Sequence, residues 1–281
     1  MSTWRRLSFQ LPEELLEEVT AVLHDAGCLG AEWRDGLLDA WFDEKAGFDP
    51  EAIASRIDAV LGPRGAAVRL RASESTPDGR WHERWMEGLQ PFEVAGRFLI
   101  VPGPDVLRPA SGLEVLRLTP GRAFGTGEHV TTRMCLEYLA SEMRPADSLL
   151  DVGTGSGILA IAARRLTSGQ IAALDTDPSS LEVAQENAVL NVTPGIWWVA
   201  GSLDALAPRP FDLVVANVAG ATIGRLMPGL SCRARRGIFL AGILDEEEQE
   251  LRQCLDRAGM RLAAIARAQG WIGMAAAPAA P

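Results

Sequence analysis

The chain has 281 residues, a formal net charge of −10, and 47% hydrophobic and 23% charged residues. This composition is typical of a globular protein, and the length allows one large domain or two ordinary ones. The excess of acid argues against binding along a nucleic-acid backbone, which needs clusters of Lys and Arg. The chain starts without an apolar signal core and has no apolar run of about 18 residues, so we expect a cytoplasmic protein without a membrane segment.

The four cysteines and three histidines are scattered along the chain. There is no C-x-x-C pair, so neither a disulfide framework nor a metal site is indicated.

Residues 1–75 are predicted to form a small α+β domain. A strand from Trp4 is followed by a helix with Pro12 in its first turn, a hairpin across Asp35-Gly36, and a second helix that Asp49 would cap. A last strand completes the order β-α-β-β-α-β of a ferredoxin-like module. The segment holds 8 basic and 14 acidic residues, a balance of −6. If it recognises a macromolecule, a basic protein suits this charge better than RNA; an acidic surface that serves solubility alone is equally compatible.

Residues 76–91 are expected to link this domain to a second one, residues 92–281. The boundary opens with polar, turn-forming residues and continues as WHERWMEGLQP. Trp81 and Trp85 are four residues apart and would share one face of a short helix. They either pack the linker onto a domain or face a partner.

The stretch from Leu149 to Ala160 predicts a buried strand, a glycine turn and the start of a helix. Gly153 and Gly155 let the backbone turn tightly and approach a ligand closely. Asp175 ends the next strand, 22 residues beyond Gly153, near the offset at which a carboxylate reaches a ribose. The dinucleotide fingerprint requires Gly or Ala where this chain has Ile158. D-x-G-x-G-x-G instead resembles the nucleoside loop of class I S-adenosylmethionine methyltransferases.

Two further stretches hold candidate site residues. A glycine-rich loop runs through His129 into a helix that begins near Thr131 and Thr132; it lacks the Gly-Lys-Ser/Thr of a Walker A loop. The two threonines either cap that helix or contact a cofactor. Asn217 ends an apolar strand, where ligands of open α/β sheets bind. The residues after it lack the N-P-P-Y tetrad associated with adenine and glutamine methylation. The tail from Ala275 to Pro281 is of low complexity and is expected to be disordered.

AFGTGEHVTTR at 123–133, together with WHERWMEGLQP and DVGTGSG, resembles the ribosomal protein methyltransferase A family over essentially the whole chain. The resemblance implies a class I methyltransferase fold (Rossmann-like α/β, mostly parallel sheet) preceded by the small ferredoxin-like domain. It implies S-adenosylmethionine as cofactor and a basic substrate, the eleventh protein of the large ribosomal subunit. Lysine side chains would be methylated, with N-terminal amino groups left open as further acceptors. Cofactor contacts are then expected at Thr132, Gly153, Gly155, Asp175 and Asn217.

By the same resemblance Asn217 would also orient the acceptor amine, and His129 would shape its pocket. We expect a monomer that binds no nucleic acid and no membrane. Three alternatives remain: a related enzyme that methylates another protein, such as the beta subunit of electron-transfer flavoprotein; a nicotinamide-dependent oxidoreductase; and a noncatalytic cofactor-binding protein.

Overall fold

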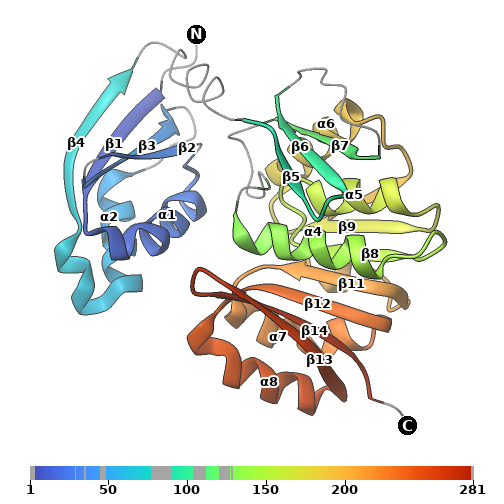
Figure 1. Cartoon of the computed structure of the whole chain (residues 1–281). Helices are drawn as coiled ribbons and strands as arrows, with labels where there is room; N and C mark the ends of the chain where they lie inside the picture. Colours follow the sequence, from blue (N-terminus) through green and yellow to red (C-terminus); the bar gives the residue numbers. More distant parts are fainter. Residues whose placement is uncertain are drawn as a thin grey trace. The chain divides into compact units, whose positions relative to one another are not determined.

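A computed structural model describes residues 4–28, 30–34, 36–44, 49–76, 90–103, 112–119, 127 and 129–279. The chain divides into two compact units, Met1–Leu89 and Gln90–Pro281 (Figure 1). The segment predicted to link two domains, with Trp81 and Trp85, lies almost wholly outside the described residues, as does most of the glycine-rich loop before His129. None of the described helices is long and apolar enough to cross a membrane.

The N-terminal unit is an antiparallel sheet with strand order β2-β3-β1-β4, covered by two helices. Its apolar core includes Leu7 and Phe9 from the sheet and Val19 and Ile57 from the helices. The predicted ferredoxin-like order is confirmed, and Asp49 caps the second helix by accepting the N–H of Glu51 at 2.9 Å. The elements are β1 (Trp4–Gln10), η1 (Glu13–Leu15), α1 (Leu16–Asp25), β2 (Gly30–Arg34), β3 (Leu37–Asp43), α2 (Pro50–Leu61), η3 (Gly62–Ala67) and β4 (Arg69–Thr76).

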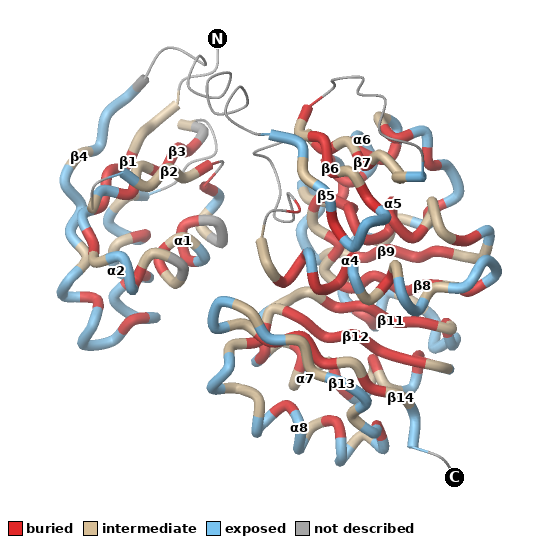
Figure 2. The backbone as a smooth tube through the Cα atoms, viewed as in Figure 1, coloured by how far each residue is buried: buried red, intermediate tan, exposed pale blue. Residues whose placement is uncertain are grey.

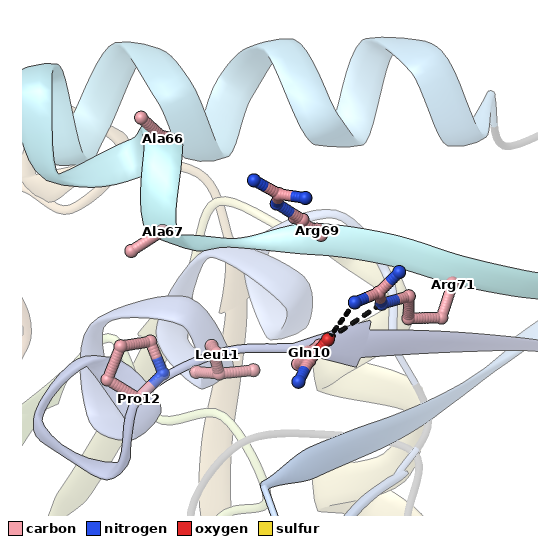
Figure 3. Close-up of a pocket in the computed structure, with 7 residues that line it drawn as sticks. All are labelled: Gln10, Leu11, Pro12, Ala66, Ala67, Arg69 and Arg71. Atoms are coloured by element: carbon pink, nitrogen blue, oxygen red, sulfur yellow. Dashed lines mark hydrogen bonds between the residues drawn. The ribbon is translucent and has the colours of Figure 1, made fainter.

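An open groove of about 430 Å³ lies on this unit between the end of β1 and the start of β4. Figure 3 shows Arg71 reaching from β4 to Gln10, whose side-chain oxygen accepts the Nε–H of Arg71 at 2.8 Å. Arg69 lies beside it with an exposed side chain. The groove is therefore a basic feature on an otherwise acidic unit.

The C-terminal unit is built on a seven-stranded sheet with strand order β10-β9-β8-β11-β12-β14-β13. All neighbours pair in parallel except β14, which is antiparallel to both β12 and β13. The order reverses between β8 and β11, which makes a switch point where open α/β sheets bind ligands. The strands are β8 (Leu149–Val152), β9 (Ile171–Asp175), β10 (Ile196–Ala200), β11 (Phe211–Asn217), β12 (Ala234–Leu244), β13 (Met260–Ala268) and β14 (Trp271–Pro278).

The sheet separates two apolar cores, and Figure 2 shows its central strands lined with buried residues. Residues of α4 and α5 fill one core, and residues of α7 and α8 fill the other. Because both faces are covered, the central strands are mostly apolar, as expected of a buried parallel sheet. Asp151 on β8 is a fully buried exception. The helices are α4 (Val130–Glu142), α5 (Ile158–Leu166), α6 (Pro178–Leu190), η4 (Leu203–Ala205), α7 (Gly220–Ser231), η5 (Asp245–Glu247) and α8 (Glu248–Arg257).

A separate three-stranded sheet, β5 (Phe92–Val94), β6 (Phe98–Pro102) and β7 (Glu114–Leu118), packs against the core on the α4 and α5 side. Two side-chain amides hold this sheet, one within α6 and one at the residue that caps the end of α6. Asn187 accepts the N–H of Thr119, and Asn191 accepts that of Arg117, both at 2.8 Å. This sheet thereby packs in one core with α5, the helix that follows the glycine turn.

One expectation is wrong. The tail is not disordered through residue 279: β14 extends to Pro278, and Ala276 is buried where β14 pairs with β12 at Ile238 inside the seven-stranded sheet. Of the two alternatives for Thr131 and Thr132, capping of α4 is excluded, because His129 is the cap residue. The helix α7 was not anticipated; Pro228 and four glycines or alanines obscure its pattern, yet Ile223, Met227 and Leu230 bury one face.

Candidate functional site

The carboxyl ends of β8, β9 and β11 lie at one edge of the sheet because these strands run parallel. Three of the predicted stretches end there: the glycine turn after Val152, Asp175 and Asn217. The site is thus assembled by the topology at the switch point, where the helices that follow neighbouring strands lie on opposite faces of the sheet.

The glycine turn has a backbone that only glycine adopts freely. Gly153, Gly155 and Gly157 have φ angles of +72°, +52° and +80°. The turn is pinned to β9, since the N–H groups of Gly153 and Thr154 both donate to the carbonyl of Leu174, at 2.9 and 3.0 Å. A Cβ on Gly157 would lie 2.9 Å from that of Ala184, so this glycine lets α5 begin directly against α6.

Asp175 holds the turn from the neighbouring strand. Its Oδ2 accepts the N–H of Gly155 at 2.9 Å, and its Oδ1 accepts the N–H of Asp177 at 3.0 Å. A carboxylate offers about four acceptor positions, so each oxygen retains capacity for a further donor such as a ribose hydroxyl. The two hydrogen bonds fix the orientation of the carboxylate before any ligand arrives.

Asn217 and Thr132 lie together on the other side of the turn. The amide nitrogen of Asn217 donates to the buried hydroxyl of Thr132 at 3.3 Å. The next residue, Val218, fits closely between two strands: a Cβ on Gly153 would lie 2.3 Å from Val218 Cγ1, and one on Gly242 would lie 2.5 Å from the Val218 carbonyl oxygen. Two glycines therefore allow the Asn217 segment to rest against the turn.

His129 begins α4 and turns its ring toward the end of the sheet. Its Nδ1 lies 2.7 Å from the hydroxyl of Thr131 and accepts the backbone N–H of Thr131 at 3.4 Å. The ring meets Trp271 edge to face, with centroids 5.0 Å apart and an angle of 79° between planes. Trp271 was not singled out from the sequence. The available signal was its place just after a Gln-Gly turn, which the pairing of Trp271 with Leu244 brings to the carboxyl edge.

Asp151 lies fully buried at the end of β8, beneath the turn that it precedes. Its Oδ2 accepts the hydroxyl of Thr154 at 2.7 Å, whereas its Oδ1 is buried without a hydrogen-bond partner in the described part of the chain. Burial raises the pKa of Asp151 to about 7; the Thr154 hydroxyl and the Ala160 N–H lower it, and the charge of Asp175 raises it.

The predicted residues therefore form connected groups rather than isolated positions. Gly155 bonds to Asp175, Thr132 bonds to Asn217, and Gly153 touches Val218 beside Asn217. His129 is on the same helix end as Thr132. Asn187 is a contributor that the sequence reasoning missed: its side chain donates to the carbonyl of Ser156 in the turn at 2.8 Å.

These residues fit a nucleoside carrying a sulfonium. The turn leaves no room for a Cβ at Gly153, Asp175 offers carboxylate oxygens at the neighbouring strand, and Asp151 supplies a buried acidic group close to both. With a mostly parallel seven-stranded sheet and this switch-point site, the C-terminal unit is a class I S-adenosylmethionine-dependent methyltransferase.

Comparison with known proteins narrows the class. A model of the family described as ribosomal protein L11 methyltransferase (PrmA) matches residues 3–278. The chain belongs to this family. A relative from Myxococcus xanthus named ribosomal protein L11 methyltransferase is 33% identical over 288 residues, covering 96% of this chain and 97% of that one. Another of that name, from Geobacter sulfurreducens, is 34% identical over 289 residues, covering 95% and 96%.

A solved structure agrees with these relatives. The crystal structure of a ribosomal protein L11 methylase from Lactobacillus delbrueckii matches with a TM-score of 0.65 and 32% identity, covering 68% of this chain and all of that one. This protein is accordingly an enzyme, a protein methyltransferase that uses S-adenosylmethionine.

Proposed function

We propose that this enzyme methylates amino groups of ribosomal protein L11, chiefly lysine side chains. The names of its full-length relatives support the substrate. The observation that carries the site assignment is the meeting of Asn217 and Thr132 at the switch point, beside the turn held by Asp175. No residue in this group is a strong base, which suits a reaction that depends on alignment more than on proton abstraction.

Each site residue has a role that follows from its position. Asp175 accepts the ribose hydroxyls, and Gly153 and Gly155 let the backbone approach the cofactor. Thr132 orients Asn217, whose amide oxygen remains available because its nitrogen donates to Thr132. That oxygen accepts from the acceptor amine and holds the lone pair of the amine toward the methyl group. His129 and Trp271 form an aromatic wall of the acceptor pocket.

When bound, S-adenosylmethionine supplies a methyl group on a sulfonium, which is a good leaving group. The chain has to align the acceptor in line with it and keep water out. A lysine has an ordinary pKa of about 10.4, and an apolar site beside a positive charge lowers it, so the amine enters neutral. Trp271 supplies part of that apolar surface.

The N-terminal unit recognises the substrate through its acidic surface. Glu13 and Glu14 are exposed in η1 and form no ion pair with a described residue, whereas Glu18 on α1 is paired with Arg64 at 2.8 Å. Unpaired carboxylates attract a basic protein and speed its association. The groove with Arg69 and Arg71 has the opposite charge, so the substrate binds away from it.

The direct test is incubation with methyl-labelled S-adenosylmethionine and ribosomal proteins from a strain without the enzyme. Label on L11, assigned to amines by mass spectrometry, supports the proposal. Label on another protein would support methyl transfer by this enzyme but reject L11 as its substrate. No label, with cofactor binding intact, rejects both the substrate and the roles given to Asn217 and His129.

Substrate recognition has a separate test. The double change Glu13→Lys and Glu14→Lys should raise the KM for L11 by about tenfold at low salt, with kcat retained, because it removes the attraction that steers the substrate. The matched control is Glu250→Lys with Asp256→Lys, two exposed acids on α8. An equal rise of KM in both variants would show a net-charge effect and contradict recognition by η1.

A further inference from the structure

The feature that the mechanism leaves unused is the carboxyl group of Asp151. The side chain is completely buried on β8 between the glycine turn and the first turn of α5. One oxygen accepts the hydroxyl of Thr154, and the other has no hydrogen-bond partner among the described residues. Buried polar atoms are rarely left without a partner, and the exceptions point to strain, to an absent ligand or to a functional role.

The groups around Asp151 do not neutralise it. Asp175, on the adjacent strand β9, is acidic and raises its pKa. Cys135 on α4 stays a neutral thiol, because burial and the charge of Asp151 raise the pKa of Cys135 well above its ordinary value. The N–H of Ala160 on α5 and the hydroxyl of Thr154 contribute only dipoles. None of the described Arg or His side chains forms an ion pair with Asp151.

The cofactor and its product differ by one charge. S-adenosylmethionine carries an ammonium, a carboxylate and a sulfonium, a net charge of +1, whereas S-adenosylhomocysteine is neutral overall. In the transfer, the methyl–sulfur bond breaks and its electron pair stays on sulfur, while the amine lone pair forms the new carbon–nitrogen bond. The positive charge passes to the acceptor nitrogen and leaves with it.

We propose that Asp151 makes the site prefer the positively charged cofactor over its neutral product, by losing its proton when S-adenosylmethionine binds and regaining one after methyl transfer. The proposal rests on the cofactor assignment. Asp151 is completely buried on β8, so it acts on the cofactor through its charge. A buried carboxylate close to the Asp175 side of the site interacts strongly with a charge placed there, because the surroundings screen it weakly.

Proton linkage predicts the direction in which the affinity for S-adenosylmethionine changes with pH. With no cofactor, burial holds the pKa of Asp151 at about 7, so the group is largely protonated at pH 6. A cation in the site lowers this pKa, so binding releases a proton, and affinity rises with pH until the free enzyme is itself deprotonated. Between pH 5.5 and pH 7 the Kd of S-adenosylmethionine should fall by about fivefold, and that of S-adenosylhomocysteine should stay nearly constant.

The experiment is isothermal titration calorimetry of the full chain in two buffers of different ionisation enthalpy, which counts protons released. The range of pH 5.5 to 7 lies below the titration of an α-amino group, about 7.7 to 8.0. The ligands are S-adenosylmethionine, S-adenosylhomocysteine, and sinefungin, which has an ammonium in place of the sulfonium. We expect proton release with the first and third and nearly none with the second.

Two variants test whether the proton released on binding comes from Asp151. Asp151→Asn should abolish the release and reduce the preference for S-adenosylmethionine by about fivefold. His129→Gln, which removes the imidazole described at the site, should leave the release intact. Equal release for both cofactor forms, or release that persists in Asp151→Asn, overturns the proposal.

If Asp151→Asn does not fold, the proton release measured for the three ligands with the wild-type enzyme tests the proposal by itself. Absence of binding by all three ligands would instead reject the cofactor assignment itself.

Discussion

The side-chain amide of Asn217 donates to the hydroxyl of Thr132 at 3.3 Å, across a separation of 85 residues. Asn217 ends β11, and Thr132 lies in the first turn of α4. The bond determines which way the amide of Asn217 faces, because its nitrogen is directed to Thr132 and its oxygen away. The two residues therefore act as one unit.

This coupling predicts non-additive effects. Asn217→Ala should lower kcat for methyl transfer by about a hundredfold, as loss of one aligned polar group does in other enzymes. Thr132→Val, nearly isosteric, should lower it less by releasing the orientation of Asn217. In the double variant, the loss of transition-state stabilisation should be smaller than the sum of the losses in the two single variants, by about 0.5–1.5 kcal/mol. Strict additivity in initial-rate measurements would show that the bond does not orient Asn217.

Asp175 should determine cofactor affinity. Asp175→Ala removes the acceptor for the ribose hydroxyls and the anchor of the Gly155 N–H, so the Kd of S-adenosylmethionine should rise by about ten- to a hundredfold. The measurement is calorimetry or equilibrium dialysis. Asp177→Ala is the control, because that residue caps α6 through Ser179 and lies two positions away. Comparable losses in both variants would indicate general disruption of this loop.

Gly153 should tolerate no side chain while Val218 is present. Gly153→Ala places a Cβ 2.3 Å from Val218 Cγ1 at a φ of +72°. We expect a loss of about 2 kcal/mol or more in stability and a weaker affinity for the cofactor. Gly195 has a similar φ of +83°, and a Cβ there would meet nothing within 4 Å. The stability lost in Gly195→Ala therefore measures the cost of the backbone conformation without a clash.

Adding Val218→Ala to Gly153→Ala should recover part of the stability, which thermal unfolding would measure. No recovery would mean that the backbone angle, and not the clash, is responsible.

Trp271 should affect the acceptor more than the cofactor. Trp271→Ala removes the ring against His129 and opens the acceptor pocket to water, so kcat should fall by about tenfold or more while the Kd of S-adenosylmethionine changes little. Trp197→Ala, at a tryptophan with 47% of its surface exposed on the edge strand β10, is the matched control. A change in cofactor Kd as large as that in kcat would assign Trp271 to the cofactor site.

Asp212 should make the sheet sensitive to acid. The hydroxyl and N–H of Ser148 hold the pKa of Asp212 below its ordinary value, and they join β11 to the start of β8. A depressed pKa stabilises the fold above the unfolded-state pKa, and this contribution is lost as pH falls through the folded-state pKa. Asp212→Asn should cost about 1 kcal/mol at pH 7.

The difference between Asp212→Asn and wild type should shrink below about pH 4, as denaturant unfolding at several pH values would show. A difference independent of pH would contradict the charge-based explanation.

The sequence by itself determined the local elements and the class of site. Glycine spacing, the acid at the end of the next strand and the Asp-Pro helix start are local constraints of backbone geometry, so Gly153, Asp175 and α2 could be placed without a structure. The motifs around them identified the family. Proline and alanine obscured α7 and the end of β14, since apolar patterning fails where small residues pack closely.

Tertiary structure alone decided the contacts between distant segments. The bond between Thr132 and Asn217, the fit of Val218 against Gly153, and the approach of Trp271 to His129 all depend on which strands are neighbours. The burial of Asp151 beneath the turn is decided in the same way, because desolvation depends on every element packed around a group. No local pattern encodes strand order, and strand order places these side chains at one edge of the sheet.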